Sequence, residues 1–220
     1  MTTLPETIEA QTGANCDAAV IWLHGLGADG HDFEPVVPAL RLRKGLAVRF
    51  IFPHAPVQPV TINMGMRMRA WYDIYQLGGA REDEAGIRAS EKLLLGLVER
   101  EKARGIAEAR IVLAGFSQGG AIVLQTALRY PARLAGIMAL STYVPLAGSL
   151  EAERDAAGAS TPIFMAHGQQ DELIGIERAR RSRELLQGLG CEIEWHEYPM
   201  GHALCPEEIE HIAEWLGRVL

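Results

Sequence analysis

The sequence is short of the residues that cross-link a fold or bind polyanions. Its 220 residues include only three cysteines, Cys16, Cys191 and Cys205. An odd number of cysteines without C-x-x-C spacing argues against a disulfide framework and a zinc knuckle, so each is expected to be a small buried side chain. Basic residues number 21 against 28 acidic ones, a net charge of −7. This balance makes nucleic acid and anionic lipid poor partners.

Apolar runs long enough to cross a bilayer are also missing. The longest apolar stretches are either interrupted by arginines or shorter than about ten residues. Residues 1–6 lack the basic and apolar regions of a signal peptide. Together with the cysteine usage, this predicts a cytoplasmic location and no integral membrane association. Hydrophobic residues make up 48% of the chain. That is enough for one core, and residues 1–220 are expected to form a single domain.

Strand-length apolar segments alternate with helical ones. Several expected strands are apolar on both faces, as a central parallel strand must be. The alternation predicts an α/β fold with a mostly parallel central sheet, helices on both faces and ligand sites at the carboxyl ends of the strands. The expected strands are Ala18–Leu23, Val48–Phe52, Ile111–Ala114, Leu134–Leu140, Ile163–Ala166 and Glu192–Tyr198. The expected helices are Phe33–Leu40, Asp83–Arg104, Gln118–Arg129, Ile176–Gln187 and Pro206–Val219.

A candidate nucleophile follows the expected strand Ile111–Ala114. Residues 115–119 read G-F-S-Q-G, a G-x-S-x-G pattern between a strand and a helix. In this context the turn is tight, the serine is strained, its hydroxyl is presented above the sheet, and the flanking residues must be small. Ser117 would lie at a helix N-terminus, which favours negative charge. The alternative is a glycine-rich turn whose serine only caps the helix.

A serine hydroxyl needs a base, and in this architecture the order along the chain is Ser, then Asp or Glu, then His. Among the last histidines, His196 falls in an expected strand and His211 in the last helix. His202 lies in the loop between them, from which an imidazole can reach the nucleophile. We therefore expect His202 to be the base.

The acid is expected in a loop after an earlier strand. Asp171 follows the strand Ile163–Ala166 and would accept the Nδ1–H of His202, which fixes the tautomer of that ring. Glu172 is the competing candidate, and Asp155 is another. Asp171 could instead serve as a helix N-cap.

The loop after the first expected strand reads H-G-L-G over residues 24–27. A loop of this kind supplies one backbone donor to an oxyanion, and the N–H after the nucleophile supplies the other. These donors are the amides of Leu26 and Gln118. His24 is interpreted as a structural residue that holds the loop.

A metal site in the same loop is the alternative for His24. It would combine His24 with His31 and with Asp29 or Asp32. This arrangement matches no recognised zinc spacing, so no metal is predicted.

Three methionines, Met64, Met66 and Met68, alternate just before Trp71. Alternation indicates a short strand with one adaptable apolar face, which is either core packing or an acyl-binding wall. With Leu173 opposite, the expected substrate-binding residues are Met66, Trp71 and Leu173.

These segments together resemble the phospholipase/carboxylesterase family, which contains bacterial carboxylesterases and acyl-protein thioesterases. The resemblance covers nearly the whole chain, in the right order, through residues 23–27, 69–73, 115–120, 167–171 and 198–202. It implies a lidless α/β-hydrolase with the triad and oxyanion amides proposed above, and it places Trp71 and Leu173 near the acyl channel. The loop at residues 78–80 is shorter than is usual in the bacterial branch. Some members of the family form dimers, so the resemblance allows a homodimer.

The expected function is hydrolysis of carboxylic esters with short to medium acyl chains through an acyl-enzyme, without a metal or organic cofactor. Residues 141–161 leave little room for a cap domain, so we expect an open, shallow cleft for small-molecule or lipid-like esters. The alternative is acyl-protein thioesterase or lysophospholipase activity with the same triad. A metal-dependent hydrolase and a non-catalytic binding protein on a hydrolase scaffold are the remaining hypotheses.

Overall fold

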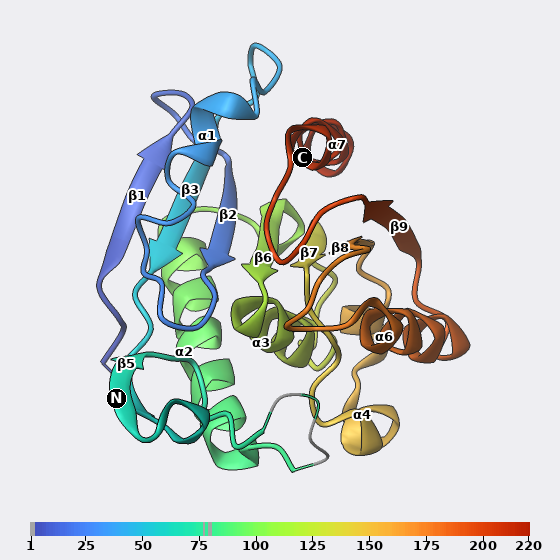
Figure 1. Ribbon diagram of the computed structural model, residues 1–220. Helices are drawn as coiled ribbons and strands as arrows, with labels where there is room; N and C mark the ends of the chain where they lie inside the picture. Colours follow the sequence, from blue (N-terminus) through green and yellow to red (C-terminus); the bar gives the residue numbers. More distant parts are fainter. Residues whose placement is uncertain (1–2, 77, 79–80) are drawn as a thin grey trace.

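The computed structural model describes residues 3–76, 78 and 81–220, and its centre is a mostly parallel sheet (Figure 1). Of the short loop at 78–80, Gly79 and Ala80 therefore lie outside the described residues. In the described chain, seven strands form the sheet in the order β1-β3-β2-β6-β7-β8-β9, and β1 runs antiparallel to β3 while the other pairs are parallel. Strands β4 and β5 form a separate antiparallel hairpin.

The strands are β1 (Thr7–Gln11), β2 (Ala18–Leu23), β3 (Val48–Pro53), β4 (Val57–Val60), β5 (Met66–Arg69), β6 (Ile111–Phe116), β7 (Gly136–Leu140), β8 (Ile163–Gly168) and β9 (Ile193–Tyr198). The helices are α1 (Val36–Ala39), α2 (Glu84–Ala103), α3 (Gln118–Ala127), α4 (Ala147–Glu153), α5 (Ala156–Ala159), α6 (Ile176–Gly188) and α7 (Pro206–Val219), with short 3-10 turns η1 (Thr61–Asn63) and η2 (Glu108–Arg110).

Helices cover both faces of the sheet, because its central strands are apolar on both sides. All six residues of β2 are buried. On one face, Leu94 of α2 and Leu124 of α3 belong to one apolar cluster. On the other, Trp22 of β2 packs in a second cluster with Ile212 and Trp215 of α7. Helices α2, α3 and α6 thus cover one face, and α1 and α7 the other (Figure 1). The expected α/β fold is confirmed.

Two of the long helices begin where their capping residues predict. Helix α2 starts after Asp83, whose Oδ1 accepts the N–H of Gly86 at 3.0 Å. Helix α7 starts at Pro206, a first-turn position where the missing N–H has no intrahelical partner to lose.

The helix expected over residues 33–40 is wrong in extent, since only Val36–Ala39 is helical. Pro35 and Pro38 disfavour helical backbone at the residues before them and cannot donate to a preceding turn.

The sequence does not predict β1 or β4. Strand β1 is the edge of the sheet, and its residues are half-buried or exposed, so it lacks the two apolar faces of a central strand. Strand β4 contains Pro59, which cannot donate to a ladder. The short strand expected at the three methionines exists as β5, but Met64 lies before it in the left-handed conformation, with φ 55°.

The connection between β7 and β8 holds only the short helices α4 and α5 in the described chain, and no cap domain is built there. None of the helices that the structure describes combines the length and apolarity needed to cross a membrane. The three cysteines are free thiols. Cys191 is buried, as expected, whereas Cys16 and Cys205 are half-buried.

The stability of this fold should fall as pH rises, because of Glu208. This side chain is fully buried in the first turn of α7, and neither carboxylate oxygen has a hydrogen-bond partner among the described residues. Burial raises the pKa of Glu208 from 4.5 to about 8. The folded state therefore keeps a proton that the unfolded state releases, and stability is lost as pH rises from about 4.5 to about 8.

Glu208→Gln should remove this dependence. The variant is expected to exceed the wild type in free energy of unfolding at pH 9 by on the order of a few kcal/mol, and to match it near pH 5. Urea denaturation at several pH values measures the difference. Parallel stability curves for the two proteins would mean that Glu208 is ionised in the fold.

Candidate active site

The candidate nucleophile lies in a strained turn where β6 passes into α3. Ser117 has φ 54° and ψ −119°, a conformation that costs on the order of 1–3 kcal/mol for a residue with a side chain. Two hydrogen bonds stabilise the turn. The N–H of Ser117 donates to the carbonyl of Leu140 at 2.8 Å, and Thr142 Oγ1 donates to the carbonyl of Ser117 at 2.7 Å. The neighbouring strand β7 therefore holds the serine in place.

The two glycines of the motif are required by close backbone contacts. A methyl group at Gly115 would lie 2.4 Å from the carbonyl carbon of Gly119, and one at Gly119 would lie 2.5 Å from the carbonyl oxygen of Leu23. Any side chain at either position would push α3 away from β6 and β2. The small residues thus bring the N-terminus of α3 directly beside the loop that follows β2.

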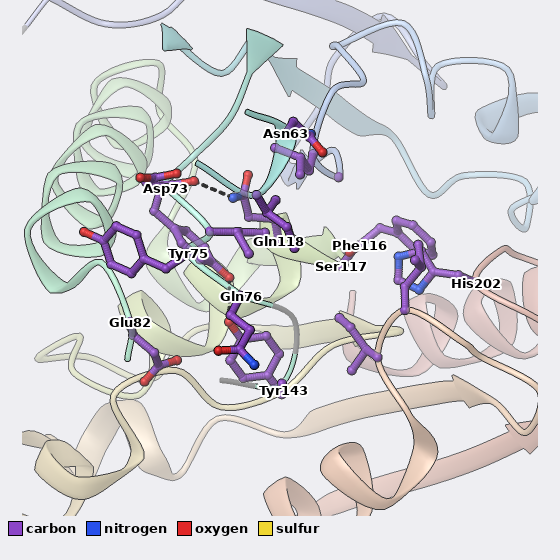
Figure 2. A pocket seen from close by; sticks show the side chains of 18 of the residues that line it. Asn63, Asp73, Tyr75, Gln76, Glu82, Phe116, Ser117, Gln118, Tyr143 and His202 are labelled. Atoms are coloured by element: carbon purple, nitrogen blue, oxygen red, sulfur yellow. Dashed lines mark hydrogen bonds between the residues drawn. The ribbon is translucent and has the colours of Figure 1, made fainter. Parts of the chain in front are cut away.

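An imidazole and a buried carboxylate meet behind this serine. His202 Nδ1 lies 2.6 Å from Asp171 Oδ2, and the Asp171 side chain is fully buried. Asp171 Oδ1 accepts the backbone N–H groups of Leu173 and Ile174, both at 2.9 Å. Because a carboxylate only accepts, His202 carries a proton on Nδ1, and in the neutral ring the lone pair is on Nε2. The ring packs against Phe116 with centroids 4.7 Å apart and the two ring planes tilted by 50° (Figure 2).

The competing acids and bases lie elsewhere. Glu172 is exposed, and Asp155 caps α5 by accepting the N–H of Ala157 at 2.8 Å. His196 and His211 stack on each other with centroids 4.6 Å apart, and His196 also stacks on Phe164 in the core beneath α7. The geometry therefore favours Asp171 and His202 over their rivals.

The loops that carry the acid and the base are tied together by their backbones. Gln169 donates its N–H to the carbonyl of Tyr198 at 2.8 Å, and Gln170 donates to Met200 at 2.9 Å. A methyl group at Gly168 would lie 2.3 Å from the carbonyl oxygen of Gly201. These contacts continue the β8–β9 pairing beyond the strands and bring His202 to Asp171.

A second histidine, for which the sequence predicted no role, also lies close to the acid. His167 Nε2 lies 2.7 Å from the carbonyl oxygen of Ile174 and 3.3 Å from Asp171 Oδ2. Burial lowers the pKa of His167, so the ring is neutral at physiological pH. The one sequence signal for it is its position in the H-G-x-x-D segment over 167–171.

Leu26 and Gln118 both border the cavity into which Ser117 faces. In the described chain, neither backbone N–H donates to a protein acceptor. The side chain of Gln118 is held elsewhere: its Oε1 accepts the N–H of Trp71 at 2.8 Å, and its Nε2 donates to the carbonyl of Tyr72 at 2.7 Å. The two amides are thus available to an oxyanion at the carboxyl edge of the sheet.

His24 holds the loop that presents Leu26. Its Nε2 accepts the N–H of Ala55 at 3.1 Å, so Nδ1 carries the proton and donates to the carbonyl of Gly25 at 2.7 Å. Burial lowers the pKa of His24 to about 4. Both ring nitrogens serve the fold, which supports the structural interpretation. Across the described residues, no group of three or more His, Cys, Asp or Glu side chains is arranged to hold a metal ion.

The cavity at this site has a volume of about 320 Å³ (Figure 2). Its apolar lining includes Leu26, Ile62, Ile74, Phe116, Leu173 and Ile174. A polar wall is formed by Tyr72, Tyr143 and Arg178. The hydroxyls of the two tyrosines lie 2.9 Å apart, and the guanidinium carbon of Arg178 lies 3.4 Å from the centre of the Tyr143 ring. The sequence offered no signal for this wall.

Two of the expected substrate-binding residues do not line this cavity. Met66 is 62% exposed on the β4–β5 hairpin, and its side chain faces solvent. Trp71 is buried beneath the site, where its Nε1 donates to the carbonyl of His24 at 2.9 Å. Leu173 does line the cavity and is 52% exposed at its rim. Of these three residues, Leu173 therefore borders the cavity, and Met66 and Trp71 lie outside its lining.

Comparison with known proteins finds similarity over nearly the whole chain. A family profile described as phospholipase/carboxylesterase matches residues 6–220. The chain is 42% identical to acyl-protein thioesterase 1 of Gibberella zeae over 213 residues, covering 92% of this chain and 91% of that protein. It is 41% identical to acyl-protein thioesterase 1 of Neurospora crassa over 209 residues, covering 90% and 85%.

Solved structures of similar proteins share this fold over nearly the whole chain. Arabidopsis thaliana SOBER1 superposes with a TM-score of 0.87 at 31% identity, covering 92% of this chain and 98% of that one. Zea mays acyl-protein thioesterase 2 superposes with a TM-score of 0.86 at 26% identity, covering 98% and 99%.

Proposed function

The chain belongs to the phospholipase/carboxylesterase family, and from this premise we propose that it hydrolyses acyl thioesters and carboxylic esters through an acyl-enzyme formed on Ser117. Membership makes it a serine hydrolase that acts on esters. The observation that carries the proposal is the hydrogen bond of 2.6 Å between His202 and the buried Asp171, behind a strained serine that opens into the same cavity as His202.

Acylation follows from the protonation state of His202. With its proton on Nδ1 held by Asp171, the ring offers the Nε2 lone pair to the hydroxyl of Ser117. The serine oxygen attacks the acyl carbonyl carbon while Nε2 takes the hydroxyl proton. Negative charge on the carbonyl oxygen is stabilised by the amides of Leu26 and Gln118. The tetrahedral intermediate then collapses, and Nε2 gives its proton to the departing thiol or alcohol.

Deacylation repeats the same steps with water. Nε2 of His202 takes a proton from a water molecule as the oxygen attacks the acyl-serine carbonyl. The acid leaves, and Ser117 recovers its proton from the imidazolium. During both halves the carboxylate of Asp171 stabilises the positive charge on His202.

For the substrate, we favour acyl thioesters over simple short-chain esters. The two curated relatives described above, each at least 41% identical, are named acyl-protein thioesterases. The apolar lining next to Ser117 suits a hydrocarbon chain, and the exposed Leu173 extends that apolar surface to the rim. Oxygen esters remain substrates in this proposal, because both reactions pass through the same acyl-enzyme.

A matched series of substrates tests this proposal. S-acyl-cysteine peptides and p-nitrophenyl esters with acyl chains from acetyl to palmitoyl would be compared by kcat/KM. We expect both classes to be hydrolysed, and long-chain thioesters to exceed p-nitrophenyl acetate by at least tenfold. A fluorophosphonate probe should abolish both activities and add one adduct, on Ser117, by intact mass. Turnover confined to short oxygen esters would leave a carboxylesterase, and the absence of turnover and adduct would overturn the proposal.

A further inference from the structure

Arg178 presents a guanidinium group to the active-site cavity. It comes from the first turn of α6 and lines the same cavity as Ser117. The guanidinium carbon lies 3.4 Å from the centre of the Tyr143 ring, so one face of the group is covered. The side chain is 26% exposed, and in the described chain none of its N–H groups forms a hydrogen bond. These donors are therefore available to a ligand in the cavity.

The carboxylate next to Arg178 balances its charge without occupying these donors. Glu82 Oε1 lies 3.9 Å from Nη2 of Arg178, which is beyond hydrogen-bond distance. The other oxygen, Oε2, accepts the backbone N–H of Leu146 at 2.9 Å, and this bond holds Glu82 in place. Burial raises the pKa of Tyr72 and of Tyr143, so both hydroxyls are neutral and supply no anion.

This pair lies away from the reacting groups. Glu82 is across the cavity from His202 (Figure 2). A substrate whose carbonyl lies at Ser117 can therefore reach Arg178 only with a group that is remote from the bond to be cleaved.

We propose that Arg178 binds a carboxylate of the substrate, remote from the ester or thioester bond, and so favours such substrates over their neutral counterparts. This rests on the proposed function, which supplies the reaction at Ser117. The planar guanidinium can give a carboxylate two parallel N–H···O bonds. A cation without an acceptor in a mostly apolar cavity is poorly solvated, and an anion offsets that cost. The positive end of the α6 dipole adds to the attraction.

Either half of a substrate can carry this carboxylate. The leaving group carries it when an acidic residue lies next to the acylated cysteine of a peptide, and the acyl group carries it in a monothioester of a dicarboxylic acid. Two matched pairs distinguish these sources. One pair is S-octanoyl-cysteine peptides with aspartate or asparagine beside the cysteine, and the other is S-adipoyl-N-acetylcysteamine and its methyl ester. In each pair we compare kcat/KM for the charged substrate with kcat/KM for the neutral one, as a ratio.

Arg178→Gln should lower this ratio by at least about tenfold in one of the pairs, the loss expected when a hydrogen bond between charged groups is removed. The pair that responds identifies the half of the substrate that carries the carboxylate. Arg181→Gln is the matched control, because it removes the same charge from an exposed side chain of α6 outside the lining of this cavity. It should leave the ratio unchanged. An equal loss for charged and neutral substrates in Arg178→Gln would overturn the proposal.

Glu82→Gln should move the ratio in the opposite direction. Glutamine keeps an oxygen for the N–H of Leu146 and removes the countercharge beside Arg178, so the ratio should rise by about threefold. Glu84→Gln, at an exposed position at the start of α2, is the control and should have no effect. An equal rise in both variants would be an effect of net charge and would contradict the role of Arg178.

Unchanged ratios in both Arg178→Gln and Glu82→Gln would refute this inference and leave the proposed function standing. If Arg178→Gln does not fold, the response of Glu82→Gln decides by the same criterion. Absence of turnover of the neutral thioesters by the wild type would instead refute the proposed function.

Discussion

Replacing Ser117 with alanine is expected to lower kcat by a factor of about 10⁴ or more while leaving the fold intact. The substitution removes the attacking oxygen, and what remains is transition-state binding by the oxyanion amides. Stability should hardly change. Alanine keeps the Cβ, so the strain at φ 54° stays the same, and the hydroxyl of Ser117 caps no helix N–H group. Turnover of a fluorogenic ester and the Tm together measure both expectations.

Ser141 supplies a matched control for this result. Like Ser117, it directly follows a strand, and it has a positive φ of 47° and is fully buried. Its hydroxyl has no hydrogen-bond partner among the described residues. Ser141→Ala should therefore keep wild-type kcat. If Ser117→Ala retained a tenth of the activity, or lost no more than Ser141→Ala, Ser117 would not be the nucleophile.

The central sheet could be predicted because its strands are apolar on both faces. The segments that form β2, β6 and β8 are buried along their whole length or nearly so. A short run that is apolar on both faces is typical of a central strand of a parallel sheet. Helix α7 could be predicted as well, since its apolar residues recur every three or four positions and Pro206 marks its start. The hydrophobic pattern therefore predicts an element when the element is fully buried, as in these strands, or has one buried face, as in α7.

The same signal failed where an element is half exposed or interrupted. The edge strand β1 pairs with β3 through its backbone, and polar residues such as Glu9 are tolerated there. Residues 33–40 have helical apolar spacing, but the two prolines restrict the helix to one turn. Backbone pairing and local proline geometry decided these segments, and neither is visible in a hydrophobic pattern.

For the site, the motifs and their order along the chain indicated the strained turn and the contact between Asp171 and His202, but not the residues that line the cavity. The G-x-S-x-G pattern constrains its own backbone, and the structure has the strained turn that it requires. Met66 illustrates the limit: a period of two predicts a strand but not where that strand lies, and no residue of β5 lines the cavity. Tyr143 and Arg178 face the same cavity from separate elements, and no local spacing links them.

Substitution of the acid, Asp171, is expected to have the second large effect on kcat. Asp171→Asn is expected to lower kcat about 10⁴-fold, by analogy with the same change in serine proteases. Asparagine can still accept the N–H groups of Leu173 and Ile174 at one oxygen, so the loop should keep its shape. Its amide nitrogen would then face His202 Nδ1. Two donors cannot share that contact, so His202 would move its proton to Nε2 and lose the lone pair that accepts the serine proton.

Glu172→Gln is the control, because it makes the same chemical change on the next residue. Glu172 is exposed, whereas the Asp171 carboxylate is fully buried and bonded to His202. The control should keep kcat within about twofold of the wild type, in line with the small effects of exposed substitutions.

Labelling by a fluorophosphonate should slow in parallel with kcat in Asp171→Asn, because both reactions need the activated serine. Full activity in Asp171→Asn together with inactivity in Glu172→Gln would transfer the role to Glu172. Burial argues against that outcome, since an exposed carboxylate on a loop cannot hold the ring of His202 in one orientation.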